Sequence, residues 1–203
     1  DSSKEFYLLG SDSYYFLYLT ENINQTGSIS EKFKNGKYYD ARMMAPFGYW
    51  RKIEAHPYIG AATHNLLQAI NPKIDLTWSL SLVPLIIYSL SLIAFIALCT
   101  TLRLRAISTF TASIFFSLSP IFIQRSCFGW YDTDPYNVIF PLLSGIFIFK
   151  TIDSNKKYKG ILLLSLITGA YSLFWQGWLL LPIFVNATFI ILFIFESIKK
   201  SKL

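Results

Sequence analysis

The sequence predicts an all-α polytopic membrane protein with about five transmembrane helices and a long N-terminal external loop. Only 15% of the 203 residues are charged and 53% are hydrophobic, whereas soluble globular proteins devote about 25% of their residues to charge. After residue 75 the hydrophobic residues form long uncharged runs, and the basic residues lie between these runs. A soluble domain, a disordered chain and a coiled coil are all excluded by this pattern.

Residues 1–75 form the first predicted unit, an external loop with interfacial helices. They are polar and aromatic and are interrupted by several glycines and prolines. Aromatic and polar residues of this kind suit the boundary between membrane and water. The first residue is Asp1, and no charged stretch leads into a short apolar run, so no secretory signal is visible and we expect the chain to begin inside a longer protein.

Residues 76–203 form the second predicted unit, a transmembrane bundle. It contains four uncharged runs, at 76–102, 106–124, 135–149 and 160–195. A helix needs about 20 residues to cross a bilayer, so the third run crosses only if its polar start lies in the interface. The last run would be roughly 54 Å long as one helix, which exceeds one tilted crossing. We therefore predict two helices there, 160–175 and 178–195, separated at Trp175-Gln176-Gly177-Trp178.

Basic residues provide an independent test of the number of crossings. Five crossings place Arg103, Arg105, the lysines of 150–159 and those of 199–202 on one side, as the positive-inside rule requires. A single crossing over 160–195 would separate the last lysines from the others, and we reject it. The net charge of +6 then marks orientation in the membrane, and no nucleic-acid partner is expected.

Candidate chemistry lies on the predicted outer face. Asp132 and Asp134 can offer oxygens to one hard divalent cation, which commonly bridges to a phosphate. The alternative is a helix start, with Asp134 or Thr133 as N-cap and Pro135 in the first turn, and both interpretations can hold together. Arg125 ends an apolar run and can contact a phosphate or extend to the interface. Asp12, taken alone, is typical of an N-cap.

Four motifs carry a resemblance to a known family. They are Gly-Ser-Asp-Ser-Tyr-Tyr at 10–15, the pair Gly-Lys-Tyr-Tyr-Asp at 36–40 with Ala-Pro-Phe-Gly at 45–48, Arg-Ser at 125–126 followed by Asp-Thr-Asp at 132–134, and Trp-Gln-Gly-Trp at 175–178. Their order resembles that of the catalytic subunit of oligosaccharyltransferases, the STT3 family. The last two motifs look closer to the archaeal AglB type, and bacterial PglB is a related form.

The resemblance implies a membrane domain of the glycosyltransferase C type and only the front of the family's membrane part. The later spans and the soluble domain with its Trp-Trp-Asp motif have no counterpart in these 203 residues. We therefore expect an N-terminal fragment of the enzyme that is inactive by itself.

The resemblance also implies transfer of an oligosaccharide from a lipid-linked phosphate or diphosphate to the Asn of an Asn-X-Ser/Thr sequon in an acceptor protein. By similarity, Asp12 is catalytic and binds the metal, Asp132 coordinates it directly and Asp134 supports it. The expected metal is Mg²⁺ or Mn²⁺, and Arg125 is expected to contact the donor phosphate. The expected location is the plasma membrane, among membrane lipids, with the active site on the extracytoplasmic face.

Two other functions stay open. Another polyprenyl-phosphate-sugar-dependent glycosyltransferase of the same fold type would lack the Trp-Trp-Asp element downstream. A membrane transporter would carry ionisable residues near the middle of its spans. The four apolar runs contain none, so we rank the transporter below both enzymes.

Overall fold

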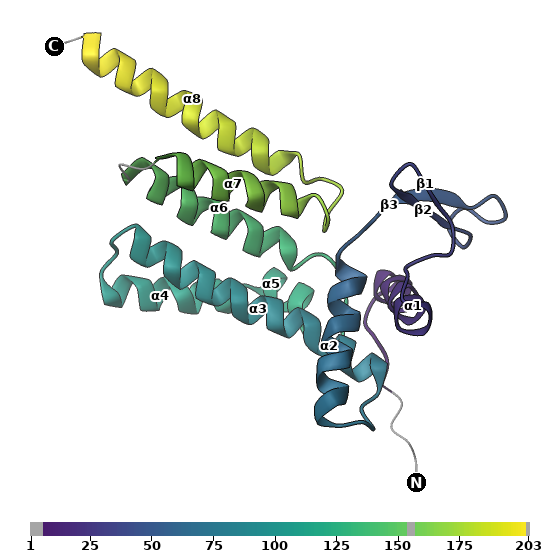
Figure 1. Ribbon diagram of the computed structural model, residues 1–203. Coiled ribbons are helices and arrows are strands. Elements are labelled where there is room, and N and C mark those ends of the chain that lie inside the picture. Colours follow the sequence, from purple (N-terminus) through teal and green to yellow (C-terminus); the bar gives the residue numbers. More distant parts are fainter. Residues whose placement is uncertain (1–5, 154–156, 202–203) are drawn as a thin grey trace.

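Helices dominate the computed structural model, which describes residues 6–153 and 157–201 (Figure 1). The elements in chain order are α1 (Ser11–Thr26), β1 (Phe33–Lys34), β2 (Lys37–Asp40), β3 (Tyr49–Lys52), α2 (His56–Ile70), α3 (Leu76–Thr101), α4 (Ala106–Ser117), α5 (Pro120–Ser126), α6 (Tyr136–Asp153), α7 (Lys157–Tyr171) and α8 (Leu180–Ser201). Helices α3, α4, α6, α7 and α8 run side by side, and α1, α2 and the sheet gather at one end of them (Figure 1).

Helix α3 closely matches the predicted span 76–102. Its start is fixed by Asp75, whose carboxylate accepts a hydrogen bond of 3.1 Å from the backbone N–H of Trp78. Helix α6 begins one residue after the predicted start at 135 and continues through Lys150 to Asp153. A helix does not end where its apolar run ends, because charged side chains in the last turn reach water while the backbone stays helical.

The predicted helix 106–124 is broken into α4 and α5. Their axes differ by 59°. The break falls at Ser119-Pro120, where Ser119 has the non-helical angles φ −58° and ψ 117°. Proline lacks an N–H donor and disfavours helical angles in the residue before it, so it starts a new helix more readily than it continues one.

Two helices occupy the last apolar run, as predicted, although their bounds differ from 160–175 and 178–195. Helix α7 ends at Tyr171 and α8 begins at Leu180, so the Trp175–Trp178 motif lies wholly in the turn between them. A side chain at Gly177 would collide with the indole ring of Trp175. The glycine therefore permits the close approach that folds this turn.

Within the described residues, two helices are long and apolar enough to cross a membrane, namely α3 and α6. The bent pair α4 and α5 adds a third if it forms one span. Helix α8 contributes a shorter apolar stretch, Leu180–Phe195. The chain is therefore a mostly helical membrane protein with two or three candidate spans, and five crossings remain a prediction.

A three-stranded antiparallel sheet in the N-terminal unit departs from the predicted fold class, so the description all-α is incomplete. Strands β1 and β2 pair Lys34 with Lys37 across a two-residue loop, and β3 pairs with β2. The loop residues Asn35 and Gly36 both have positive φ, 52° and 70°. Asn-Gly is the strongest short hairpin signal in a sequence, and it is present at these positions.

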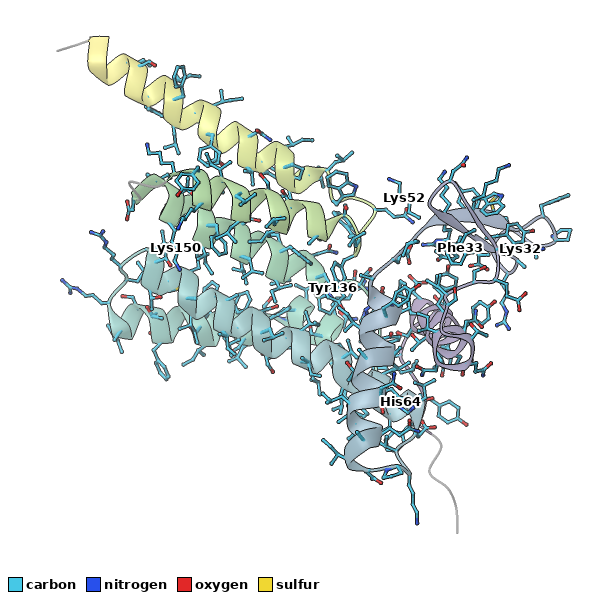
Figure 2. All side chains as sticks on the ribbon, viewed as in Figure 1. Lys32, Phe33, Lys52, His64, Tyr136 and Lys150 are labelled. Carbon is cyan, nitrogen blue, oxygen red and sulfur yellow. The ribbon has the colours of Figure 1, made fainter. Side chains whose placement is uncertain are left out.

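The N-terminal unit shares a hydrophobic core with the bundle. Phe16 and Leu19 of α1 pack in one cluster with Leu80 and Val83 of α3 and with Tyr131. Charged side chains mark the two ends of the molecule: Lys32 and Lys52 lie at the sheet, and Lys150 lies at the opposite end of the bundle (Figure 2). The sheet, α1 and α2 are therefore fixed to the end of the bundle where α6 begins.

Candidate active site

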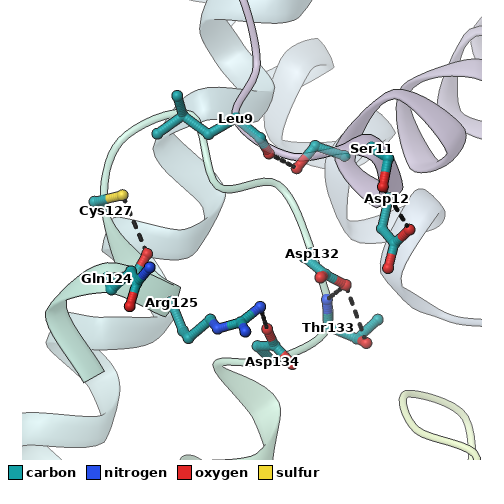
Figure 3. A network of polar contacts seen from close by, with 10 residues as sticks. Leu9, Ser11, Asp12, Gln124, Arg125, Cys127, Asp132, Thr133 and Asp134 are labelled. Atoms are coloured by element: carbon teal, nitrogen blue, oxygen red, sulfur yellow. Dashed lines mark hydrogen bonds and ion pairs between the residues drawn. The ribbon is translucent and has the colours of Figure 1, made fainter. Parts of the chain in front are cut away.

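The loop between α5 and α6 meets the start of α1 at the sheet end of the bundle (Figure 3). The backbone N–H of Leu9 donates to the carbonyl oxygen of Gly129 at 2.8 Å, and the N–H of Gly129 donates to Ser81 of α3 at 3.2 Å. Gly129 has φ 90°, a conformation that favours glycine. These bonds bring the predicted site residues from opposite halves of the chain to one place.

Asp12 lies in the first turn of α1 and is exposed. It is not the N-cap, because the helix follows Gly10 and no side chain caps it. Its carboxylate accepts a hydrogen bond of 3.3 Å from the hydroxyl of the neighbouring Ser11. Backbone N–H groups at a helix start favour a negative charge. The carboxylate therefore lies beside the loop and is not engaged in capping (Figure 3).

Asp132 is half-buried in the loop and accepts hydrogen bonds from Thr133, at 2.5 Å from its backbone N–H and 3.4 Å from its hydroxyl. Burial raises the pKa of the Asp132 carboxyl, and the nearby carboxylates of Asp134 and Asp12 raise it further. The bond from the Thr133 N–H opposes this rise. Asp132 is thus close enough to both other aspartates for their charges to act on its carboxyl group.

Arg125, in the last turn of α5, forms an ion pair with Asp134 at 3.0 Å between Nη1 and Oδ2. Its guanidinium also lies 4.8 Å from the centre of the Trp130 ring. The two charged side chains are 48% and 32% exposed, so we expect the pair to contribute only about 0–1 kcal/mol. A stronger ligand for either partner can therefore displace the other.

A helix does start after this segment, since α6 begins at Tyr136 directly after Pro135. The backbone N–H of Asn137 donates to the carbonyl oxygen of Asp134 at 3.0 Å. The carboxylate of Asp134, however, points to Arg125 (Figure 3). The same short segment thus starts a helix with its backbone and presents acidic groups with its side chains.

The donor set fits a hard divalent cation in its chemistry. All three candidate ligands offer carboxylate oxygens. Burial is the main cause of the raised pKa of Asp132, and a cation there would offset the further rise that comes from the nearby carboxylates. In the described part of the chain, the side chains do not bring three His, Cys, Asp or Glu residues close enough together to hold a metal ion. Mg²⁺ commonly uses only one or two carboxylates and completes its sphere with water and substrate phosphate.

A buried polar cluster under the loop was missed by sequence reasoning. We call it the Tyr131 cluster, and it consists of Thr20, His56, Tyr131 and Tyr136. The Tyr131 hydroxyl lies 2.9 Å from that of Thr20, and His56 Nδ1 lies 3.2 Å from the Tyr136 hydroxyl. Burial lowers the pKa of His56 to about 3. The cluster joins α1, α2 and α6 directly beneath the acidic loop.

One sequence signal points to this cluster, namely Gly60, which interrupts an otherwise good helix pattern in α2. A side chain at this position would collide with the hydroxyl of Tyr131. The glycine therefore allows α2 to approach the loop. Tyr15, about one turn after Asp12, makes a separate contact on the sheet side, where its hydroxyl donates to the buried Asp40 at 2.8 Å.

The chain is similar to known proteins in sequence and in fold. The family described as oligosaccharyl transferase STT3, N-terminal, matches residues 1–203. A dolichyl-phosphooligosaccharide-protein glycotransferase of Methanococcus voltae is 30% identical over 196 residues, which cover 88% of this chain and 20% of that protein. The chain thus spans about a fifth of the length of this relative.

Solved structures share the fold. The oligosaccharyltransferase of Archaeoglobus fulgidus in complex with Zn and sulfate superposes with a TM-score of 0.71 at 18% identity, covering 92% of this chain and 24% of that one. AglB of the same organism, in complex with an inhibitory peptide and a dolichol-phosphate, gives 0.72 at 17% identity, covering 91% and 22%. The same values are found for the enzyme tethered to an acceptor peptide with an NVT sequon. The chain therefore belongs to the STT3 oligosaccharyltransferase family, of the archaeal AglB-like type, and corresponds to its N-terminal region.

Proposed function

We propose that this chain forms the N-terminal part of an enzyme that transfers an oligosaccharide from a lipid-linked phosphate or diphosphate to the Asn of an Asn-X-Ser/Thr sequon. The observation that carries the proposal is the convergence of Asp12 with Asp132 and Asp134 at one end of the candidate spans (Figure 3). Family membership and the ligands of the Archaeoglobus fulgidus structures, an acceptor peptide and a dolichol-phosphate, support it.

Asp12, Asp132 and Asp134 would hold a divalent cation, Mg²⁺ or Mn²⁺, and such a cation would stabilise negative charge on the leaving phosphate as a Lewis acid. The presence of Zn in a related structure supports a divalent-cation site in this fold. The Oδ2 atom of Asp134 is engaged by Arg125, so coordination through this oxygen would compete with the ion pair.

Asp12 has a second role toward the acceptor. An amide nitrogen is a poor nucleophile because its lone pair is delocalised over the carbonyl group. A carboxylate that accepts a hydrogen bond from the amide N–H orients the nitrogen and favours loss of that delocalisation. Asp12 suits this role because it is exposed at the end of a helix, whereas Asp132 is half-buried.

Arg125 contacts the donor phosphate in this proposal. A guanidinium recognises phosphate through paired N–H donors. The exposed ion pair with Asp134 holds the guanidinium at the edge of the acidic loop and is weak enough to be exchanged. If the Asp134 carboxylate served as a cation ligand, the Arg125 guanidinium would be free to bind the phosphate.

We further propose five crossings with residues 1–75 and the acidic loop on the extracytoplasmic face of the plasma membrane. Helix α3, the pair α4 and α5, and helix α6 would form three of these crossings. Helices α7 and α8 would form the other two. Arg103 and Asp153 support this arrangement, since they form an ion pair of 3.4 Å at the end of the bundle opposite the sheet. The test introduces Lys34→Cys or Arg103→Cys into a protein whose free cysteines, Cys99 and Cys127, are replaced by Ser. With a membrane-impermeant maleimide, intact cells should be labelled in the Lys34→Cys variant only.

The experiment that tests the function uses the full-length enzyme with a sequon peptide and lipid-linked donor. Asp12→Asn, Asp132→Ala and Asp134→Ala should each reduce transfer by at least about 100-fold, because each removes a group that touches the cation or the acceptor. Asp153→Asn is the matched control, since it changes an exposed aspartate at the opposite end, and it should retain activity. Near-normal transfer by all three site variants would refute the assignment.

For Arg125, replacement by Gln keeps hydrogen-bonding capacity and removes the charge. It should raise the KM for the lipid-linked donor about tenfold while leaving the KM for the peptide unchanged. An equal change in both values would mean that Arg125 acts on the fold of the loop.

A further inference from the structure

Tyr131 connects the acidic loop with helices α1 and α2. It is fully buried. Its hydroxyl lies 2.9 Å from the hydroxyl of Thr20 on α1 and donates at 3.4 Å to the carbonyl oxygen of His56 on α2. Asp132 follows it directly in the sequence. A displacement of Tyr131 therefore moves the backbone of Asp132 as well.

The ring of Tyr131 has little freedom to move. It packs at 4.2 Å from the centre of the His56 ring and at 6.4 Å from that of Phe16. Gly60 of α2 lies so close to the hydroxyl that a side chain there would collide with it. Closely packed aromatic side chains hold one orientation, so the hydroxyl is presented to Thr20 at a defined place.

Helix α1 is consequently attached to the acidic loop at two points. Before the helix, the Leu9 N–H bonds to Gly129 at 2.8 Å. About two turns after Asp12, Thr20 contacts Tyr131. A helix is stiff over this length, so two attachments fix both its position and its direction relative to the loop. Asp12 is carried on the part of the helix between these points.

The two carboxylates are not joined by a contact of their own. Asp12 accepts a hydrogen bond from Ser11 and Asp132 from Thr133, and no direct hydrogen bond joins the two side chains among the described contacts. Their separation is therefore set by the helix and the loop that carry them. Residues that orient the ligands of a metal commonly affect its affinity by 10–100-fold.

We propose that Tyr131 is a positioning residue that sets the separation of Asp12 from Asp132 through the contact of its hydroxyl with Thr20. The inference rests on the proposed function, because it assumes that both aspartates hold the divalent cation. The Tyr131 hydroxyl does not touch the cation or the substrates. Its effect is exerted through the position of α1.

The test measures Mn²⁺ binding to the purified full-length enzyme by electron paramagnetic resonance of the free ion. Tyr131→Phe keeps the packed ring and removes only the hydroxyl. It should raise the Kd for Mn²⁺ about tenfold, while the kcat at saturating Mn²⁺ stays within about twofold of wild type. Thr20→Val should raise the Kd for Mn²⁺ by the same factor. The double variant should bind Mn²⁺ no more weakly than either single variant, because both substitutions remove the same contact.

Tyr38→Phe is the matched control. Tyr38 is equally buried, and its hydroxyl also contacts α1, at 3.0 Å from that of Tyr15, but it lies on the sheet side and away from the loop. It should leave the Kd for Mn²⁺ unchanged. An unchanged Kd in Tyr131→Phe, or an equal rise in Tyr38→Phe, would overturn the inference, the second because it would indicate a general effect on stability.

Asp132→Ala distinguishes failure of this inference from failure of the proposed function. If wild type binds Mn²⁺ and Asp132→Ala does not, the proposed metal site is supported, and the Tyr131→Phe result then decides whether Tyr131 positions the ligands. If Asp132→Ala binds Mn²⁺ as wild type does, the metal assignment is wrong and the inference falls with it.

Discussion

Acidification should destabilise the protein through His56, because its imidazole is fully buried at the centre of the Tyr131 cluster. The rings that contact it belong to Phe16, Tyr131 and Tyr136, and none of them carries a charge at neutral pH. Its Nε2 atom is buried and has no hydrogen-bond partner among the described residues. A proton on this atom would bring an uncompensated charge into the core.

The size of the effect follows from the pKa of His56, which burial lowers from 6.5 to about 3. Above pH 6.5 neither the folded nor the unfolded state binds the proton, so His56 does not lower the free energy of unfolding in that range. Between the two pKa values only the unfolded state binds it, and the free energy of unfolding falls by about 1.4 kcal/mol per pH unit. At pH 5 the loss is therefore about 2 kcal/mol, and it is complete only below the folded pKa.

The assay is thermal unfolding of the full-length protein in detergent, followed by tryptophan fluorescence at about pH 7.5 and about pH 5. His56→Gln removes the titrating group, so its Tm should fall less on acidification than that of wild type. For a cooperative unit of 150–250 residues, 2 kcal/mol corresponds to a difference of about 4–8 °C. Tyr38→Phe, which removes a buried hydroxyl that contacts Tyr15 and leaves the contacts of His56 in place, should show the full acid loss. Equal losses in wild type and His56→Gln would refute the reasoning.

Two further predictions concern the packing around Gly60 and the activity of residues 1–203 alone. Gly60→Ala should lower the Tm, because the collision with Tyr131 costs about 1–3 kcal/mol and outweighs the helix propensity gained. Gly169→Ala, where an added methyl group meets no atom within 4 Å, should be neutral or stabilising in the same scan, and a loss there as large as at Gly60 would contradict this explanation. Residues 1–203 alone should show no transfer to a sequon peptide under conditions in which the full-length enzyme is active, and measured turnover by the fragment would disprove this.

Much of the bundle is predictable because a membrane helix is defined by the absence of charge. The runs 76–102 and 135–149 locate α3 and α6 to within a few residues, and the Trp175–Trp178 motif locates the turn between α7 and α8. The errors have local causes. Ser119-Pro120 breaks a predicted helix, and Asn35-Gly36 forms a hairpin in a unit where only helices are predicted. Both signals are present in the sequence.

The candidate site, too, was predictable from the sequence only in part. Residue spacing and position single out Asp132, Asp134 and Arg125, and the motif resemblance adds Asp12. The sequence does not show that Asp134 pairs with Arg125, nor that Asp12 is not a helix cap. Side-chain partners depend on the directions in which neighbouring elements present their residues, and a spacing in the chain does not specify those directions.

The sequence by itself determined that this is a membrane protein, where its apolar helices lie, and which acidic residues to compare with the STT3 family. Hydropathy and charge act locally along the chain, so they can be read without a fold. Only the tertiary structure decided that α1 is attached to the loop of Asp132 through Tyr131, with Gly60 leaving room for the contact. That arrangement arises from packing between residues far apart in sequence, and such packing is fixed by the shape of the assembled core.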